Sequence, residues 1–253
     1  MAPEAVFQFS WFFAFARSIG MKTVRLVIFD VAGTIIEDHG EVAQTFQQAL
    51  QNHGVAVSEA ELWEWRGASK PEVIRHFVGR QLGAAGDHSE LIAQTYAEFR
   101  ALLESRYRQG VTPIAGAEAT FRWLAARGIK IATTTGFYRE VNDLILEQTG
   151  WRVMINAVVC SSDVRQGRPA PFMIFHAMEA TGVTNVSEVM NVGDTALDLR
   201  SANNAGVGFA VAVLSGAVAR GRLEREPHTH LIESVADIPG LVSTLSPLPT
   251  RPV

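Results

Sequence analysis

The sequence predicts an α/β fold, in which a parallel sheet carries helices on both faces and a helical cap follows the first strand. Apolar strand-like runs alternate with helical patterns from residue 112 onward, which is the order expected of a parallel sheet. Residues 36–110 show helical periodicity and almost no strand signal. Four glycines follow the predicted helices of the alternating part, as helix ends favour: Gly128, Gly150, Gly182 and Gly206. These observations indicate a Rossmann-like core with an inserted cap domain.

The core elements are predicted from the positions of the apolar runs. The strands are expected over residues 24–29, 129–133, 153–160, 189–192 and 207–213. The helices between them are expected over residues 117–127, 138–149, 171–181 and 196–205. No strand is predicted over 228–232, because His228-Thr229-His230 is interpreted as an exposed loop.

The cap is predicted from two apolar stripes at helical spacing. The first stripe consists of Val42, Phe46, Ala49 and Leu50. The second consists of Ile92, Tyr96, Phe99, Leu103 and Tyr107. Thr112-Pro113 marks the return of the chain to the core. We therefore expect an N-terminal extension over residues 1–20, a core formed by 21–35 and 112–253, and a helical cap over 36–111.

The N-terminal extension is rich in Phe and Trp. Residues 6–16 carry no charge, but this stretch is shorter than the about 20 apolar residues that span a bilayer. Glu4 stands where a secretory signal would have basic residues, so a signal peptide fits poorly. We interpret the segment as a non-essential extension, with Met21 as an alternative start. A membrane-surface anchor is the competing interpretation, although we expect no stable membrane association.

The composition limits the classes of partner. Hydrophobic residues make up 47% of the 253 residues and charged residues 19%, as in a globular protein with a sizeable core. The net charge of -4, without a long basic block, argues against nucleic acid as a partner. Cys160 is the only cysteine, which fits a reducing, cytoplasmic compartment, and we interpret it as a small buried hydrophobe rather than a catalytic thiol. The sequence does not specify the oligomeric state, and a homodimer is one arrangement that it allows.

Polar motifs follow four of the predicted strands, at the edge where open α/β sheets bind ligands. They are Asp30, Thr133-Thr134-Thr135-Gly136, Arg168, and the stretch from Asn191 to Asp198. Each motif alone has a structural explanation, as a turn, a β-branched strand end, a loop or a helix cap. Their occurrence together, at matching strand ends, indicates a single site.

The residue two positions after Asp30 is Ala32. Many phosphate-transferring hydrolases carry a second aspartate at this position. The carboxylate of Asp30 can attack phosphorus, but no acid stands at the usual place to protonate a departing alkoxide. The missing acid at Ala32 limits the reactions expected of the site more than any other feature of the sequence does.

The motifs resemble those of the haloacid dehalogenase superfamily of phosphohydrolases over residues 22–244. Asp-x-Ala-Gly-Thr at 30–34, Gly167-Arg168-Pro169 and the cap stretch Gly67-Ala68-Ser69-Lys70 are similar to its phosphonatase branch, which includes phosphonoacetaldehyde hydrolases and phosphonatase-like hydrolases. Thr134-Thr135-Gly136 and Gly193-Asp194-Thr195-x-x-Asp198 fit the remaining motifs. The chain departs from phosphonoacetaldehyde hydrolases at Val31, Arg66, Val73 and Phe137. These differences lie around the substrate and concern its identity more than the reaction type.

The resemblance implies a phosphoaspartyl intermediate at Asp30 and Mg²⁺ as the cofactor. Mg²⁺ would be bound by oxygens of Asp30, the Ala32 carbonyl and Asp194. Asp198 is expected to hold a metal-bound water or to orient Arg168.

The resemblance also implies a phosphate cradle around the transferred group. Thr134, Thr135 and the amide of Gly136 are expected to bind phosphate where a helix begins, with Thr135 as a catalytic residue. Arg168 would complete the neutralisation of charge on the transferring group.

Lys70 and Arg66 are the cap residues expected to reach the substrate. Lys70 precedes Pro71 at a predicted helix N-terminus, and Arg66 lies four residues away. Both effects should lower the pKa of the lysine, as an amine nucleophile requires. A Schiff base with an aldehyde would make the leaving group an enamine instead of an alkoxide, which would explain Ala32. The alternatives for Lys70 are a phosphate or carboxylate contact from the cap, and a solvated surface lysine.

Two enzymatic functions fit these motifs. The first is a Mg²⁺-dependent hydrolase that cleaves the C–P bond of a small phosphonate, such as phosphonoacetaldehyde or a relative. The second is a phosphomonoesterase acting on a small phosphorylated metabolite, with its acid supplied by the cap or its leaving group already activated. A binding module without catalysis is disfavoured by four intact residues: Asp30, Thr135, Arg168 and Asp194. A halide-releasing dehalogenase is disfavoured because Asp194 and Asp198 beside Asp30 suit a metal.

Overall fold

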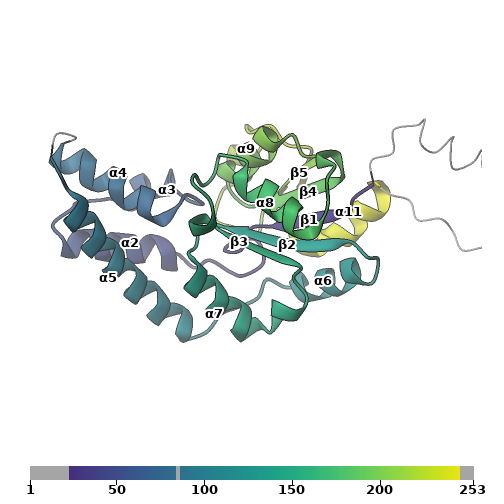
Figure 1. The fold of residues 1–253 in the computed structure, drawn as a ribbon, viewed down its shortest axis with the longest axis horizontal. Coiled ribbons are helices and arrows are strands. Elements are labelled where there is room, and N and C mark those ends of the chain that lie inside the picture. Colours follow the sequence, from purple (N-terminus) through teal and green to yellow (C-terminus); the bar gives the residue numbers. More distant parts are fainter. Residues whose placement is uncertain (1–22, 84–85, 246–253) are drawn as a thin grey trace, which may run out of the picture.

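The computed structural model describes residues 23–83 and 86–245, which form a six-stranded parallel sheet with helices packed around it (Figure 1). The order of the strands is β3-β2-β1-β4-β5-β6. Their bounds are β1 Leu26–Phe29, β2 Lys130–Thr135, β3 Ala157–Cys160, β4 Val189–Gly193, β5 Phe209–Val213 and β6 His230–Ile232. The predicted α/β class with a Rossmann-like parallel sheet is therefore confirmed.

The helices of the core lie on both faces of the sheet. In Figure 1, α8 and α9 lie on one face and α6, α7 and α11 on the other. Their bounds, with that of the short α10, are α6 Ala117–Ala125, α7 Arg139–Thr149, α8 Phe172–Thr181, α9 Ala196–Ala205, α10 Arg220–Leu223 and α11 Ile238–Leu245. Short 3₁₀ turns cover Trp151–Val153, Ser161–Asp163, Val186–Glu188 and Val235–Asp237.

The central strand β1 is buried on both faces, as its continuous apolar sequence predicts. Val27 and Phe29 belong to the large core cluster, and the ring of Phe29 lies 5.3 Å from that of Phe121 on α6. Leu26 and Ile28 belong to the cluster on the opposite face, which includes residues of α8. Because packing on both faces fixes β1, the position of Asp30 at its end is fixed as well.

Two parts of the sheet differ from the sequence-based expectation. The strand predicted over 153–160 begins only at Ala157, because Trp151–Val153 forms a 3₁₀ turn that buries Trp151 and leaves Val153 91% exposed. The prediction of an exposed loop at His230 is wrong, since His230–Ile232 forms the edge strand β6. A strand of 3 residues is too short to show alternation in its sequence.

The cap consists of four helices between β1 and α6. Their bounds are α2 Glu41–Asn52, α3 Glu59–Trp63, α4 Lys70–Leu82 and α5 Ser89–Arg108. The two apolar stripes predicted for the cap face each other, and the rings of Phe46 on α2 and Phe99 on α5 stack with centroids 4.2 Å apart. Helices α2 and α5 thus bury their apolar stripes against each other.

The two connections between core and cap run side by side. Ile36 and Pro113 form an antiparallel bridge, and the amide of Glu37 donates to the carbonyl of Thr112 at 2.9 Å. Figure 1 shows the cap, α2 to α5, projecting from one side of the sheet. The domain limits predicted from the sequence stay a proposal, and the bridge at 36 and 113 agrees with their placement.

The N-terminal extension predicted over residues 1–20 lies outside the described residues. Among residues 23–83 and 86–245, none of the helices has the length and apolar character that crossing a membrane would need.

Candidate active site

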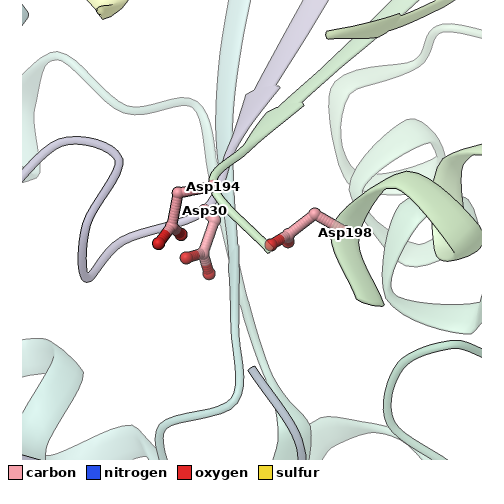
Figure 2. A group of neighbouring side chains, drawn as sticks. All are labelled: Asp30, Asp194 and Asp198. Atoms are coloured by element: carbon pink, nitrogen blue, oxygen red, sulfur yellow. The ribbon is translucent and has the colours of Figure 1, made fainter. Parts of the chain in front are cut away.

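Three buried aspartates meet at the carboxyl edge of the sheet (Figure 2). Asp30 follows β1, Asp194 follows β4, and Asp198 lies in the first turn of α9. Each offers a carboxylate oxygen within 4.8 Å of the others. The adjacency of β1 and β4 explains the meeting, since the amide of Asp30 donates to the carbonyl of Val192 at 2.9 Å.

Asp198 is held by the start of α9. Thr195 is the N-cap, and its hydroxyl accepts a hydrogen bond from the amide of Asp198 at 3.3 Å. In return, the carboxylate of Asp198 accepts from the amide of Thr195 at 3.1 Å, which completes a capping box. The capping box of Thr195 and Asp198 therefore begins the helix and also orients a carboxylate of the site.

Asp194 occupies a space that two glycines leave open. Gly33 has a φ of +83°, and a Cβ atom there would lie 2.4 Å from Asp194 Oδ2. A Cβ atom at Gly216 would lie 2.0 Å from the same oxygen. The hydroxyl of Thr34 donates to Asp194 Oδ1 at 3.3 Å. Side chains at either glycine would displace this carboxylate.

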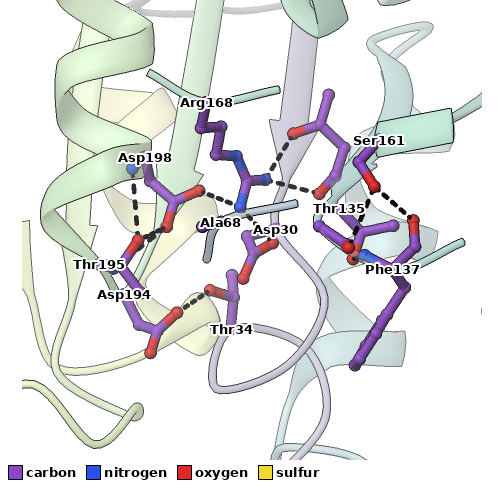
Figure 3. A network of polar contacts seen from close by, with 12 residues as sticks. Asp30, Thr34, Ala68, Thr135, Phe137, Ser161, Arg168, Asp194, Thr195 and Asp198 are labelled. Carbon is purple, nitrogen blue, oxygen red and sulfur yellow. Dashed lines mark hydrogen bonds and ion pairs between the residues drawn. The ribbon is translucent and has the colours of Figure 1, made fainter. Parts of the chain in front are cut away.

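Arg168 joins the aspartates to β2 (Figure 3). Its Nη1 atom donates to Asp30 Oδ1 at 2.8 Å and forms an ion pair with Asp198 Oδ1, also at 2.8 Å but without hydrogen-bond geometry. Its Nη2 atom donates to the carbonyl of Thr134 at 2.7 Å and to the hydroxyl of Thr134 at 3.0 Å. The expectation that Asp198 orients Arg168 thus has a direct geometric basis.

Among the described residues, Arg168 is the one side-chain cation that forms ion pairs with these three aspartates. Arg168 provides one positive charge against the three buried carboxylates. Burial, followed by the charges of Asp30 and Asp198, raises the pKa of Asp194 well above its usual value. Burial also raises the pKa of Asp198 to about 6, although Arg168 opposes this shift. A set of oxygen donors with excess negative charge suits a hard divalent cation.

The phosphate-binding segment predicted after β2 is buried close to this cluster. The hydroxyl of Thr135 accepts from the amide of Phe137 at 3.1 Å. The side chain of Thr134 bonds to Arg168, and its direct contact with phosphate stays a prediction. The helix expected over 138–149 is α7, Arg139–Thr149, with Tyr138 as its N-cap, so the segment Thr135-Gly136 lies just before the start of a helix.

The cap loop that carries Lys70 packs directly on the core. A Cβ atom at Gly136 would lie 2.7 Å from the carbonyl oxygen of Ala68, and one at Gly67 would lie 2.9 Å from Thr195 Oγ1. A Cβ atom at Gly167 would lie 3.3 Å from the Cβ of Ser69. The loop thus rests against three separate segments of the core, and the cap is closed over the aspartates.

Lys70 is buried beneath this loop, with 6% of its surface exposed. Its Nζ atom lies 3.4 Å from the carbonyl oxygen of Ala68 and 5.1 Å from the ring centroid of Phe137. The alternative of a solvated surface lysine is therefore wrong. Burial lowers the pKa of Lys70 to about 8, against the charges of Asp30 and Asp38, with smaller contributions from Arg168 and Arg66. The predicted direction holds, but burial is the main cause, and Arg66 has the smallest effect.

Asp30, Asp194 and Lys70 line one pocket between cap and core, of about 570 Å³ counted to its open mouth. Trp65 and Phe137 form part of its apolar wall. The Ala32 position, the Thr135-Gly136 segment and Arg66 also line it. The pocket therefore brings predicted residues of the core and of the cap to a single space, whereas Arg168, Asp198 and Thr134 are not among the residues that line it.

Asp38 is a pocket residue that sequence reasoning missed. Its Oδ2 atom pairs with Nη2 of Arg66, and its Oδ1 atom accepts from the amide of Gly40 at 2.9 Å. The signal available in the sequence was an acidic residue two positions before a glycine, in the linker from β1 to the cap.

Cys160 is fully buried, and burial raises its pKa to about 12, which confirms the structural interpretation of this thiol.

Comparison with known proteins agrees with this site. Residues 27–212 match the family model of haloacid dehalogenase-like hydrolases. Phosphonoacetaldehyde hydrolase of Bacillus cereus is 31% identical over 218 residues, with 80% of each chain covered. A bifunctional phosphonoacetaldehyde hydrolase/aminoethylphosphonate transaminase of Clostridioides difficile is 30% identical over 222 residues, which cover 83% of this chain and 34% of that protein.

Solved structures share the fold. A phosphonoacetaldehyde hydrolase-like protein from Oleispira antarctica has a TM-score of 0.77 and 24% identity, covering 89% of this chain and 93% of its own. A β-phosphoglucomutase from Clostridium difficile has a TM-score of 0.75 and 15% identity, covering 85% and 93%. The family match and the curated relatives establish that the chain belongs to the haloacid dehalogenase-like hydrolases and is an enzyme of the phosphonatase-like type.

Proposed function

We propose that this hydrolase is Mg²⁺-dependent and cleaves the C–P bond of a small phosphonate with a carbonyl group, such as phosphonoacetaldehyde or a relative. The observation that carries the proposal is the burial of Lys70 in the pocket that Asp30 lines, together with Ala32 two residues after Asp30. The pocket thus offers a nucleophilic carboxylate and an amine, but no acid at position 32.

Asp30 is the proposed nucleophile toward phosphorus. Its hydrogen bond from Arg168 fixes the carboxylate and engages Oδ1, which leaves Oδ2 for the attack. Transfer of the phosphoryl group to Asp30 gives a phosphoaspartyl intermediate, which water then hydrolyses to phosphate. Arg168 also places positive charge beside the transferred group.

The oxygens proposed to hold Mg²⁺ are those of Asp30, Asp194 and the Ala32 carbonyl, with Asp198 contributing directly or through water. Bound there, the cation would offset the repulsion between the carboxylates and an anionic substrate. The chain contributes the rigid donor set, and Thr34 and the two glycines around Asp194 keep that carboxylate in place.

Lys70 is proposed to form an imine with the carbonyl carbon of the substrate. The neutral amine attacks the carbonyl, and loss of water gives a protonated imine. When Asp30 attacks phosphorus, the electron pair of the C–P bond forms the C=C bond of an enamine, and the C=N pair moves to the nitrogen of Lys70. Protonation of the carbon and hydrolysis of the imine release the carbonyl product. No alkoxide leaves, so no acid is needed at Ala32.

The second candidate is a phosphomonoesterase whose acid comes from the cap. Asp38 is the cap-side carboxylate that lines the pocket. Both of its oxygens already accept hydrogen bonds, from Arg66 and from the amide of Gly40. This engagement favours a positioning role for Asp38 and weakens the case for it as the acid.

Trapping with borohydride tests the proposal. Incubation with phosphonoacetaldehyde and borohydride should inactivate the enzyme irreversibly, and mass spectrometry should place the adduct on Lys70. Lys130 is exposed at the start of β2 and serves as the internal control for random modification. An adduct shared equally between Lys70 and Lys130 would contradict the imine.

Substitution of Lys70 tests it independently. Lys70→Arg keeps the positive charge but cannot form the imine, so it should be as inactive as Lys70→Ala on the aldehyde. The phosphomonoesterase alternative predicts partial activity in Lys70→Arg, with no trapping. A panel of phosphonates and phosphomonoesters, assayed for phosphate release with and without Mg²⁺, separates the two functions.

A further inference from the structure

Arg66 presents an unused set of donors to the pocket. Its side chain is 13% exposed and lies in the cap segment between α3 and α4. Nη2 pairs with Asp38, and the guanidinium carbon lies 4.6 Å from the ring centroid of Trp63. Among the described residues, Nε and Nη1 of Arg66 make no hydrogen bond. Stacking on Trp63 uses the face of the guanidinium and leaves donors in its plane.

Asp38 holds this guanidinium in place. Its two oxygens are bound from two sides, by Arg66 and by the amide of Gly40. The plane of Arg66 is therefore fixed by an ion pair at one edge and an aromatic ring on one face. A guanidinium with fixed orientation suits a carboxylate, because its remaining N–H groups can donate charge-assisted hydrogen bonds to a carboxylate oxygen.

The pocket thus contains three recognition groups. Asp30, paired with Arg168, is the proposed partner of the transferred phosphoryl group, Lys70 is the proposed partner of the carbonyl carbon, and Arg66 remains. Lys70, Asp30, Asp38 and Arg66 line the same pocket, so the amine shares this space with the nucleophile and with the Asp38–Arg66 pair. A simple aldehyde carries nothing for Arg66 to bind.

We propose that the preferred substrate carries a carboxylate on its carbonyl carbon, as in a 3-phosphono-2-oxo acid, and that Arg66 binds this carboxylate. The inference rests on the proposed C–P cleavage at the same site. Lys70 forms the imine at carbon 2, Asp30 attacks phosphorus, and the C–P electron pair forms the enamine as before. Protonation of carbon 3 and hydrolysis of the imine then release a 2-oxo acid, while water frees phosphate from Asp30. Overall, one water molecule is consumed for each C–P bond cleaved.

The test compares two probes, 3-phosphonopyruvate and phosphonoacetaldehyde, by the ratio of their kcat/KM values for phosphate release. The wild-type ratio should favour 3-phosphonopyruvate. Arg66→Met, which keeps the length of the side chain without its charge, should lower the ratio by ~10- to 100-fold, as expected for a lost charged hydrogen bond. Asp38→Asn should lower the ratio in the same direction, mainly through the KM of the oxo acid.

Arg80→Met is the matched control. Arg80 also lies in the cap, pairs with Glu61 and lies 4.8 Å from the ring centroid of Phe77, but it does not line the pocket. Its substitution should leave the ratio unchanged. A ratio that responds equally to Arg66→Met and Arg80→Met would overturn the inference and make the Arg66 pair a structural contact.

The outcomes separate this inference from the proposed function. Turnover of phosphonoacetaldehyde but not of 3-phosphonopyruvate would overturn the carboxylate inference and leave C–P cleavage standing. Failure on both phosphonates, with hydrolysis of phosphomonoesters, would overturn both proposals. Turnover of both probes, with a ratio that falls only in the Arg66 and Asp38 variants, supports both.

Discussion

The two walls of the active site differ in how firmly their proposed nucleophiles, Asp30 and Lys70, are held. On the core side, Asp30 and Asp198 are bound through Arg168, and Asp198 also closes the cap of α9. On the cap side, the amine of Lys70 has one long contact, 3.4 Å from the carbonyl oxygen of Ala68. From this difference we infer separate roles for the two walls. The rigid core determines the reaction at phosphorus, and the cap determines which molecule is brought to it.

The largest expected effect is on the core side. Asp30→Asn removes the nucleophile and an oxygen ligand together, so turnover of every substrate should fall by more than ~100-fold, or ~2.7 kcal/mol in activation free energy. Steady-state assays on phosphonates and phosphomonoesters measure this loss, and circular dichroism checks the fold. More than about 1% residual activity on any substrate would refute the role of Asp30.

The next effect separates activity from stability. Asp194→Asn should raise the Mg²⁺ concentration needed for half-maximal activity by more than ~10-fold, because it removes a charged ligand. The same change relieves the repulsion from Asp30 and Asp198 that raises the pKa of Asp194. Without metal, in EDTA, the variant should therefore have a higher melting temperature than the wild type. Each ~1 kcal/mol gained in the free energy of unfolding should raise the melting temperature by roughly 2–4 °C. A lower melting temperature in EDTA would show that this carboxylate stabilises the metal-free fold.

On the cap side, the effect should depend on the substrate and on pH. Imine formation needs a neutral amine, and burial lowers the pKa of Lys70 to about 8. Below that pH the amine is mostly protonated, so kcat/KM for phosphonoacetaldehyde should fall about tenfold for each pH unit and should level off above pH 8. Hydrolysis of a phosphomonoester needs no imine, so its kcat/KM should not show this fall below pH 8. The same fall with both substrates would mean that the titrating group belongs to the core and not to Lys70.

The core side was also the side that sequence reasoning could predict. Strand ends of a parallel sheet meet at one edge, so Asp30, Arg168 and Asp194 could be placed together from the order of elements alone. The ion pair between Asp38 and Arg66 joins a linker to a cap loop. It could not be predicted, because neither segment has a periodic sequence pattern that indicates its neighbours. The cause of the Lys70 shift was missed for the same reason, because burial depends on how the cap closes. Within the sheet, β6 was not predicted, because it is a short edge strand that pairs only with β5 among the described strands.

The smallest expected effect concerns the contact between the two walls. Gly67 and Gly54 both lie in the cap with positive φ, +81° and +73°, so alanine at either should cost ~1–2 kcal/mol of stability. Only at Gly67 would the new Cβ meet the core, 2.9 Å from Thr195 Oγ1, while among the described residues a Cβ at Gly54 would have no atom within 4 Å apart from its adjacent residues.

Both glycine variants should therefore lose similar thermal stability, but their catalysis should differ. Gly67→Ala should lower kcat/KM by roughly 5-fold, the equivalent of ~1 kcal/mol, because the cap loop must move away from Thr195, which orients Asp198. Gly54→Ala should keep wild-type kcat/KM. Equal kinetics in the two variants would mean that closure of the cap loop on Thr195 does not limit turnover, and that the two walls act independently.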